Sequence, residues 1–378
     1  MRMKMTTGRL VALVLAMTLV AAACGDDDAE EPATTAAPTT EAAAEETTTA
    51  PSTTAAPTTT EAAETTEAPV EETVVLDFST SSVPDDHHTM AIYKFEELVE
   101  ASSGGSIEVE VFDSASLYDQ NAEQTALLRG DIAMAYTSSQ WLSERVPAAS
   151  IVGVPYMITD VEHLYAVMDS QVGQDIFAAA VAEAGVRPLT SVYLGTRQLN
   201  LKDVGTISTP ADMEGVKLRV PDSPSWIAMG NALGANPTPI AFGELYLALQ
   251  TGTVEGQDNP LPTTFNAKFY EVTDQIVLTG HLVNDVWPTI NEEIWQSLSE
   301  NQQNLVVEAW IEARDFATDI ALQAEADLVS FFEGEGLTVY EPDRDAFRTH
   351  VLDELLGNED LTATFTDGHY DIIQELAG

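Results

Sequence analysis

The chain has 378 residues, which is enough for two domains, and it carries 62 acidic against 15 basic side chains, a formal net charge of −47 at pH 7. This balance excludes nucleic acid and anionic lipid surfaces as partners, because both are held by clustered lysines and arginines. The chain has one cysteine, Cys24, and therefore cannot form an internal disulfide.

The first 23 residues have the pattern of a secretory signal peptide. Arg2, Lys4 and Arg9 precede an apolar run, Leu10–Ala23, which only Thr18 interrupts. This run is shorter than the roughly 20 apolar residues that cross a membrane as a helix. A basic start, a short apolar core and small residues at its end predict export and cleavage.

Cys24 follows this signal directly, after Val20-Ala21-Ala22-Ala23. The junction resembles a bacterial lipobox, in which the cysteine is diacylated and becomes the new N-terminus, although a lipobox more often has leucine where Ala21 stands. The resemblance implies that Cys24 anchors the chain to the outer face of the cytoplasmic membrane. The alternative is a plain signal peptide that is cleaved nearby and leaves an incidental thiol.

Residues 24–72 are predicted to form a disordered tether behind that anchor. After Cys24 they consist almost entirely of Ala, Thr, Glu, Asp and Pro, and Ala36–Glu45 nearly recurs as Ala55–Glu64. The segment shows no apolar periodicity that could build a core. A disordered chain of this length reaches on the order of 40 Å.

From Val74 onward, short apolar strands alternate with amphipathic helices. The first predicted elements are strand Val74–Ser79, helix Thr89–Ser102, strand Ser106–Phe112, helix Gln120–Arg129, strand Ile132–Tyr136, and helices Asp160–Asp169 and Gln174–Ala184. The next are strands Val186–Tyr193 and Lys217–Val220, helix Ser223–Leu233, strand Pro237–Ile240, helix Phe242–Gln250, and strands Val254–Gln257 and Gln275–Leu282. This alternation predicts an α/β architecture with mainly parallel strands.

A long helix is predicted over Glu300–Phe332, which contains neither glycine nor proline. A helix of about 33 residues spans about 50 Å. That length exceeds one small domain, so we expect the helix to pack across two lobes.

Motifs of enzymes and metal sites are scarce in the sequence. It lacks His-Glu-x-x-His, Gly-x-Ser-x-Gly, a Walker loop and Gly-x-Gly-x-x-Gly. Asp85-Asp86-His87-His88 could ligate a metal, but acids between a strand and a helix are ordinary capping residues. The stretch Asp367–Asp371 is equally ambiguous and more typical of a turn. We therefore predict no catalytic residue, no metal and no cofactor.

Two arginines occupy unusual positions in a chain with few basic residues. Arg197 comes just after the predicted strand Val186–Tyr193, and Arg219 lies inside Leu-Arg-Val of the predicted strand Lys217–Val220. A buried guanidinium destabilises the fold unless it is paired, and its planar fork grips a carboxylate with two parallel hydrogen bonds. The partner is either an acid of the chain itself or the carboxylate of a ligand.

Three motifs in one stretch resemble a known family. They are Gly215–Pro221 (GVKLRVP), Ala232–Pro239 (ALGANPTP) and Ala248–Pro260 (ALQTGTVEGQDNP). Their order and spacing resemble the solute-binding subunits of TRAP transporters, the DctP-type family, and Gly195–Gln198 (GTRQ) resembles the glycine-arginine signature of that family. The likeness covers roughly Val74 to Gly378 and leaves the tether unmatched.

The resemblance implies a two-lobed α/β fold like that of periplasmic binding proteins, with mixed sheets flanked by helices and one long helix bridging both lobes. We place lobe I at residues 73–194 plus 285–324 and lobe II at residues 195–284 plus 325–378. Such proteins are not enzymes. They close on a small organic acid, a mono- or dicarboxylate, outside the cytoplasm and deliver it to the membrane subunits of the TRAP transporter.

The resemblance also assigns roles to single residues. Arg219 would hold the ligand carboxylate bidentately and Arg197 would be a second basic contact. Asn259 would donate an amide hydrogen bond and Phe242 would wall the pocket. Some family members that bind sialic acid carry a glutamate in the region where Ser138 and Ser139 stand here. A hydroxyl at Ser138 would change the polar contacts, which argues against sialic acid as the ligand.

Three tryptophans, Trp141, Trp226 and Trp287, either line the pocket or fill the core, and we favour the core for each. Two other classes of function remain as alternatives. A secreted hydrolase acting on acidic sugars would need a pair of carboxylates, one with a raised pKa. An adhesin on a stalk, which the tether suggests, would bind a macromolecule and lack a cleft that closes.

Overall fold

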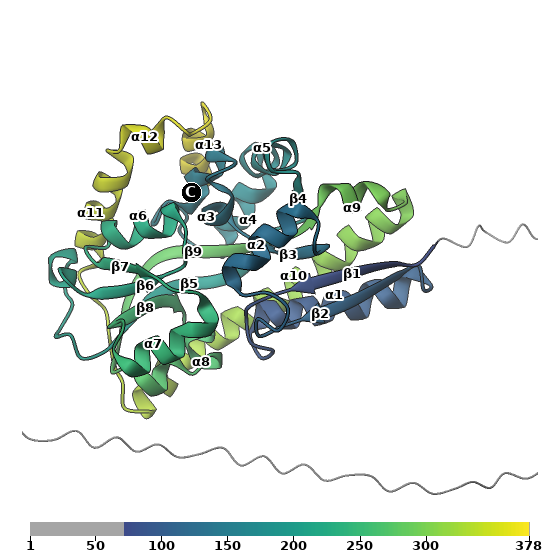
Figure 1. Cartoon of the computed structure of the whole chain (residues 1–378). Helices are drawn as coiled ribbons and strands as arrows, with labels where there is room; N and C mark the ends of the chain where they lie inside the picture. The colour runs from purple at the N-terminus through teal and green to yellow at the C-terminus, as the bar shows by residue number, and fades with distance from the viewer. Residues whose placement is uncertain (1–71, 378) are drawn as a thin grey trace, which may run out of the picture. The chain divides into compact units, whose positions relative to one another are not determined.

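The computed structural model describes residues 72–377 (Figure 1). Its strands are β1 (Val74–Ser79), β2 (Ile107–Phe112), β3 (Met134–Thr137), β4 (Val186–Pro188), β5 (Val192–Leu201), β6 (Lys217–Val220), β7 (Asn236–Pro239), β8 (Gly256–Pro260), β9 (Gln275–Asn291) and β10 (Thr338–Tyr340). Its helices before β9 are α1 (His87–Ser103), α2 (Gln120–Arg129), α3 (Ser139–Leu142), α4 (Val161–Asp169), α5 (Gln171–Ala179), α6 (Pro224–Ala232), α7 (Leu245–Thr251) and α8 (Leu261–Asn266). Those after β9 are α9 (Glu292–Ser297), α10 (Glu300–Gly334), α11 (Arg344–Leu356), α12 (Glu359–Thr362) and α13 (His369–Leu376).

The predicted signal peptide and Cys24 lie outside the described residues, as does the tether up to residue 71, and all three stay predictions. In the described part, no helix combines the length and the apolar character that crossing a membrane requires.

The strands pair in two groups, and both contain parallel and antiparallel neighbours. Sheet A consists of β1 between its parallel neighbours β2 and β3, with β3 and β4 antiparallel to the end of β9. Sheet B consists of β6 between its parallel neighbours β7 and β8, with β5 antiparallel to both β8 and β9, and β10 parallel to the start of β9. The mixed sheets confirm the fold that the resemblance implies, whereas the alternation alone predicts too much parallel pairing.

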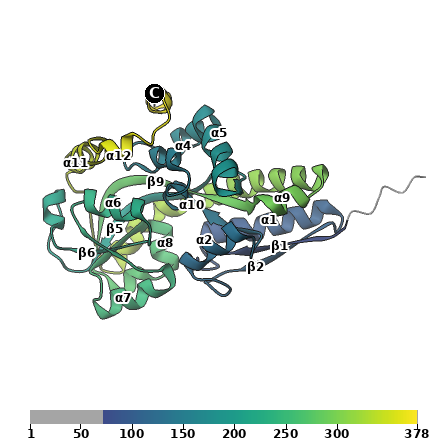
Figure 2. The same cartoon turned by 45° about the horizontal axis from the view of Figure 1, so that its top comes forward.

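Two long antiparallel strands connect the sheets. The pairing of β5 with β9 runs from Val192 opposite Val286 to Leu201 opposite Gln275, so β9 serves sheet B with its first residues and sheet A with its last. Figures 1 and 2 show β1 and β2 at one end of this ribbon and β6 at the other. Every residue of the ribbon is buried or half-buried, which explains its length.

Helix α10 confirms the predicted long helix and packs along both sheets. Trp310 stacks on Phe95 of α1 at a ring-centroid distance of 4.5 Å, in the core cluster that covers sheet A. Near the other end, Leu328 and Phe332 belong to a separate cluster with Leu261 of α8, beside sheet B. The helix begins at a capping box in which Ser299 accepts from the Gln302 amide.

Several predicted boundaries are wrong. The strand predicted over Val186–Tyr193 is divided between β4 and β5, and β5 continues to Leu201 because Gly195, with a φ of 124°, forms a bulge instead of ending the strand. Arg197 therefore lies within a strand and not after one. The turn expected near Gly368 precedes helix α13, which the sequence did not predict.

Candidate functional site

A cavity lies beside the ribbon of β5 and β9 and between elements of sheets A and B. Its empty volume is about 650 Å³, part of it open to solvent. All five residues that the sequence nominates for ligand contact line it, namely Arg197, Arg219, Asn259, Phe242 and Ser138. Their roles in binding stay predictions, but one cavity brings together side chains that lie up to 121 positions apart in the chain.

The topology explains why these side chains meet. Ser138 directly follows β3, Arg219 is near the end of β6, and Asn259 is near the end of β8. The hydroxyls of Thr80 and Ser81 directly follow β1 and line the same cavity. Ligands in open α/β sheets bind at the carboxyl ends of strands, and this cavity has that position in both sheets.

Arg219 is 1% exposed and is held by neutral acceptors. Its Nε donates to the carbonyl of Ile240 at 2.7 Å and its Nη2 donates to Oε1 of Gln120 at 2.8 Å. Among residues 72–377 its guanidinium forms no ion pair. Burial lowers the pKa of Arg219 to about 9, which still leaves the side chain charged at neutral pH.

Arg197 has its charge neutralised within the protein. Its Nε donates to Oδ2 of Asp258 at 2.6 Å, its Nη1 donates to Oδ1 of Asn284 at 3.1 Å, and its Nη2 donates to the Asp258 carbonyl. The guanidinium stacks on the ring of Trp226, 4.6 Å from its centroid. Burial alone would raise the pKa of Asp258, but Arg197 and His281 hold it below its usual value.

The sequence left open whether a buried arginine pairs with an acid of the chain or is available to a ligand carboxylate, and the two arginines differ in this respect. Arg197 has the internal ion pair, and its cavity-facing position is compatible with a secondary contact at most. Arg219 lines the cavity with a charge that no ion pair among residues 72–377 neutralises. A carboxylate in the cavity would complete the coordination of Arg219 with charge-assisted hydrogen bonds.

Phe242 and Asn259 are fixed by their neighbours. Phe242 packs edge-on against Phe269 at a centroid distance of 5.5 Å, and the Arg219 guanidinium lies 6.0 Å from its ring. The Nδ2 of Asn259 donates to Oε1 of Gln257 at 2.5 Å. Both side chains can therefore present one face to a ligand without losing their support.

Sequence reasoning missed Gln120 and Glu123 on the first turn of α2. Both line the cavity, and Gln120 also accepts from the amide of Phe242 at 3.1 Å. The only signal in the sequence is that they lie three positions apart on a predicted helix, which puts them on one face. Nothing in the sequence tells which face borders the cavity.

The tryptophans divide between the two interpretations. Trp141 is half-buried and lines the cavity, so the preference for the core was wrong for it. Trp226 belongs to the buried core, as expected, and also lines the cavity. Trp287 is fully buried, packs edge-on against Phe177 and donates from Nε1 to Oδ2 of Asp285 at 2.5 Å. For Trp287 the core interpretation is confirmed.

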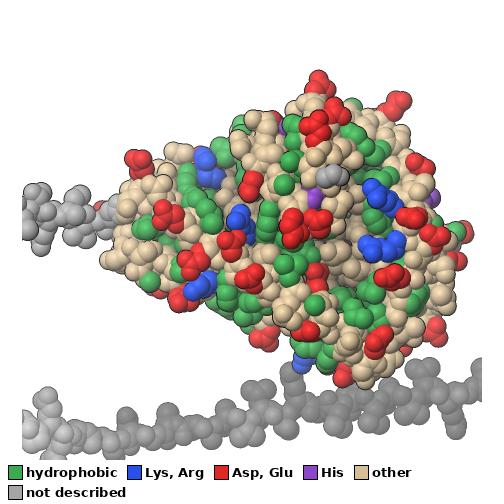
Figure 3. Space-filling view, turned by 180° about the vertical axis from the view of Figure 1, so that it is seen from behind, with side chains coloured by type: hydrophobic (Ala, Val, Ile, Leu, Met, Phe, Trp, Pro, Cys, Tyr) green, Lys and Arg blue, Asp and Glu red, His purple; other side chains and the backbone are tan. Residues whose placement is uncertain are grey.

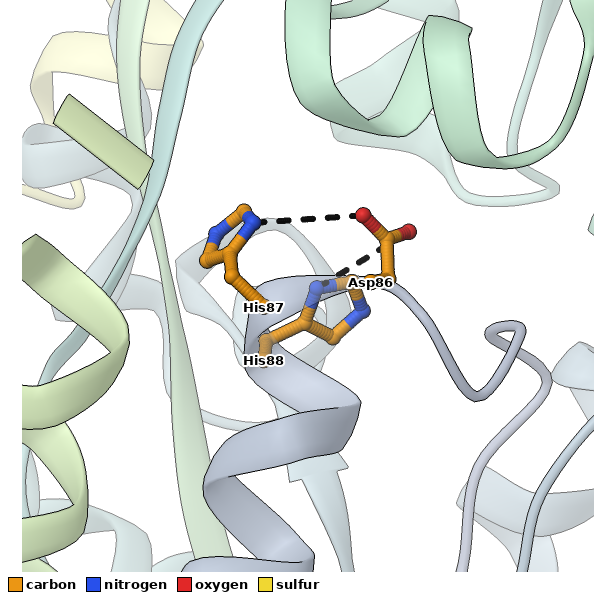
Figure 4. Close-up of side chains that lie close together, drawn as sticks. All are labelled: Asp86, His87 and His88. Carbon is orange, nitrogen blue, oxygen red and sulfur yellow. Dashed lines mark ion pairs between the residues drawn. The ribbon is translucent and has the colours of Figure 1, made fainter. Parts of the chain in front are cut away.

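Asp86, His87 and His88 form a buried cluster at the start of α1, beside the cavity (Figure 4). The Nδ1 atoms of the two histidines lie 3.9 and 4.0 Å from the Asp86 oxygens. Ligands of one zinc ion lie about 3.3 Å apart when the metal–ligand bonds are about 2.05 Å, so this spacing is wider than coordination requires. The three side chains are close enough together to hold a metal ion, but their spacing is not that of a tetrahedral zinc site.

The same cluster links separate elements. Asp86 is the N-cap of α1, but its side chain makes no capping hydrogen bond, so the capping interpretation is wrong for this residue. Its Oδ1 instead accepts from Thr263 and Asn266 of α8, at 3.3 Å each. Nε2 of His87 lies 3.2 Å from the carbonyl of Tyr193 in β5. The start of α1 is thereby tied to both α8 and β5.

Figure 3 shows acidic side chains spread over the face that it displays, with few lysines and arginines between them. A buried positive charge such as that of Arg219 is therefore the exception in a molecule of net charge −47.

Comparison with known proteins agrees with this arrangement. The family of bacterial extracellular solute-binding proteins, family 7 (DctP), matches residues 78–356. The chain is 36% identical over 252 residues to the sialic acid-binding periplasmic protein SiaP of Vibrio cholerae, covering 67% of this chain and 78% of that protein.

Two solved structures of TRAP periplasmic solute-binding proteins from Roseobacter denitrificans are also similar. One holds 3-deoxy-D-manno-oct-2-ulosonic acid (KDO), with a TM-score of 0.77 and 40% identity over 81% of this chain and all of that one. The other holds L-galactonate, with a TM-score of 0.74 and 30% identity over 82% of this chain and all of that one. The chain belongs to the DctP family of TRAP periplasmic solute-binding proteins.

Proposed function

We propose that this protein captures a small organic acid outside the cytoplasm and delivers it to the membrane subunits of a TRAP transporter. The observation that supports this most directly is the buried Arg219 guanidinium, which lines a cavity and has no acidic partner among residues 72–377. The relatives support the ligand class, since those described above bind sialic acid, KDO and L-galactonate.

In this proposal the ligand carboxylate receives two hydrogen bonds from Arg219, with Asn259 and Phe242 at its side. Lobe I (73–194 and 285–324) and lobe II (195–284 and 325–378) close around it. Closure removes water, which strengthens the pairing of guanidinium and carboxylate. The closed form is the one that the membrane subunits would recognise. The ligand leaves chemically unchanged, so the protein acts as a receptor and not as an enzyme.

A thermal-shift screen of organic acids tests the ligand class, because a ligand at a hundredfold excess over its Kd adds about 2.7 kcal/mol to the free energy of unfolding. Arg219→Ala should abolish the shift for every acid that binds. Arg348→Ala, at an exposed arginine of α11 that does not line the cavity, is the matched control and should leave the shifts intact. Retained binding by Arg219→Ala would refute the assignment, and NMR of the recovered ligand checks that no turnover occurs.

The membrane anchor is a separate part of the proposal. Cys24→Ser should remove the acylated cysteine and move the exported protein from the membrane fraction to the soluble fraction. If fractionation of the unaltered protein already finds it soluble and unlipidated by mass spectrometry, the anchor is wrong and the ligand proposal is unaffected.

A further inference from the structure

We infer that the cavity selects a hydroxylated monocarboxylate, a sugar acid, over a dicarboxylate, and that Glu123 of α2 is the specificity-determining residue that receives hydroxyl groups of the ligand. This inference rests on the proposed function, since it names the class of acid that the same cavity would take.

The first argument is the supply of positive charge. Among residues 72–377, Arg197 and Arg219 are the arginines that line the cavity, and no lysine does. Asp258 already neutralises Arg197. His88 also lines the cavity, but burial lowers its pKa to about 3, so it is uncharged at neutral pH. The cavity can therefore pair one carboxylate, and a second one would be desolvated without a cation.

The second argument is the wall next to Arg219. Gln120 holds the Arg219 guanidinium, and Glu123 lies three positions further along α2, on the same face of the helix. Glu123 is 5% exposed, and its Oε2 has no hydrogen-bond partner. An acceptor of this kind fits a ligand hydroxyl, which donates a hydrogen bond, and it disfavours a second carboxylate, which can only accept.

The third argument is that the unpartnered polar atoms around the cavity are of different kinds. Oγ of Ser138 and Nε1 of Trp226 are buried without a partner, and both residues line the cavity, as Glu123 does. Buried polar atoms without a partner are few in folded proteins. A carboxylate oxygen, a serine hydroxyl and an indole N–H together need groups that both donate and accept. Hydroxyl groups do both, whereas methylene groups do neither.

Acids in the cavity wall add to this preference, and Glu123 is one of them. Burial, and after it Asp119, raises the pKa of Glu123 well above its usual value, and a further negative charge nearby would raise this pKa more, so a second carboxylate is disfavoured there. Asp285 is a second buried acid that lines the cavity. A second carboxylate in the cavity would share the space with these two acids, and the one other arginine of the lining is already paired with Asp258. The chain thus keeps acids where a receptor for dicarboxylates would need bases.

The test compares acids of the same carbon skeleton by isothermal titration calorimetry on the mature protein. Galactonate and gluconate are paired with the dicarboxylates galactarate and glucarate and with hexanoate, which has no hydroxyl groups. At least one sugar acid should bind 100-fold or more tighter than its dicarboxylate counterpart. Equal or tighter binding of the dicarboxylates would overturn the inference and leave the proposed receptor function standing. Absence of binding by every carboxylate would instead refute the proposed function itself.

Variants of Glu123 then test whether this residue receives the hydroxyl groups of the ligand. Glu123→Ala should raise the Kd for the sugar acid by about tenfold or more and leave the Kd for hexanoate within twofold of its original value. Glu123→Gln keeps a hydrogen-bonding group without the charge, so it should retain most of the sugar-acid affinity and improve binding of the matched dicarboxylate. Ser138→Ala provides a second variant on another element, with a smaller loss confined to hydroxylated ligands. Equal loss for hexanoate and sugar acid, or no loss in either variant, would overturn the assignment.

Discussion

The side-chain amide oxygen of Gln120 accepts from Nη2 of Arg219 at 2.8 Å, and this contact joins helix α2 to strand β6 across 99 positions of the chain. The same oxygen accepts from the backbone amide of Phe242 at 3.1 Å. Gln120 thereby sets the orientation of the guanidinium without neutralising it. A neutral partner leaves the positive charge available, whereas a carboxylate at this position would compete with the ligand.

Gln120→Ala should therefore weaken ligand binding without changing which acids bind. One hydrogen bond to a charged group is lost, worth about 1.5–3 kcal/mol, so we expect a rise in Kd of about 10-fold or more. Calorimetric titration across an acid panel measures both quantities. Gln323→Ala, on the outer side of α10 where Gln323 pairs with Asp327, is the control. A changed order of preference among the acids would show that Gln120 touches the ligand itself.

Substitutions of Arg197 and Arg219 should have different effects: one should mainly lower stability, and the other should mainly remove ligand binding. Arg197→Met leaves the Asp258 carboxylate buried without its ion pair, which we expect to lower the free energy of unfolding by about 3–5 kcal/mol. Arg219→Met removes a buried charge that has no ion pair, so it should cost little stability while ligand binding disappears. Urea unfolding and titration calorimetry on both variants give the comparison. Equal stability losses would contradict this division of roles.

The histidines at the start of α1 should make the fold sensitive to acid. Burial lowers the pKa of His87 to about 4 and that of His88 to about 3, whereas the unfolded chain titrates near 6.5. Below pH 6.5 the unfolded state binds more protons, so stability should fall as the pH drops from about 6.5 toward 4.

Burial raises the pKa of Asp86 and Glu123, and these carboxyls act in the opposite direction because the folded state takes up their protons first. The informative quantity is therefore the difference between the unaltered protein and His87→Gln, measured by urea unfolding at several pH values. The slope of stability against pH should be shallower in the variant between pH 6.5 and 4. Parallel curves would mean that His87 does not contribute.

Ligand association should become faster as salt is added. An anionic ligand approaches a chain of net charge −47, and ions screen this repulsion. Stopped-flow fluorescence can follow the reaction, because Trp141 and Trp226 line the cavity. A rate that falls with ionic strength would show that the local field of Arg219 outweighs the net charge.

The sequence predicts those parts of the fold that depend on local patterns. Strand Lys217–Val220 has the predicted bounds, and helix α10 begins at the predicted Glu300, because apolar periodicity and capping residues lie within each segment. Strand β9 is longer than its prediction, since residues 283–291 are stabilised by β3, β4 and β5 and not by their own pattern. Pairing between distant segments leaves no such local trace.

The candidate site likewise contains residues that the sequence singles out and residues that only the fold reveals. Arg219 stands out in the sequence because a charge interrupts an apolar strand. The partnership of Arg197 with Asp258 spans 61 positions, and no spacing in the sequence shows which of the many acids would take it. Gln120 and Glu123 look like ordinary polar residues of a helix until the fold places that helix against β6.

Because β5 and β9 run without interruption from sheet A into sheet B, the two halves have no flexible loop about which to turn at this crossing. Any opening of the cavity has to be absorbed as bending and twisting of paired backbone. The register shifts of β5 lie at Tyr193–Gly195 and at Arg197–Leu199, on either side of Thr196, and the second one begins at Arg197. The irregular part of β5 thus lies next to the guanidinium that pairs with Asp258. Bending of the ribbon would therefore also move this part of the cavity lining.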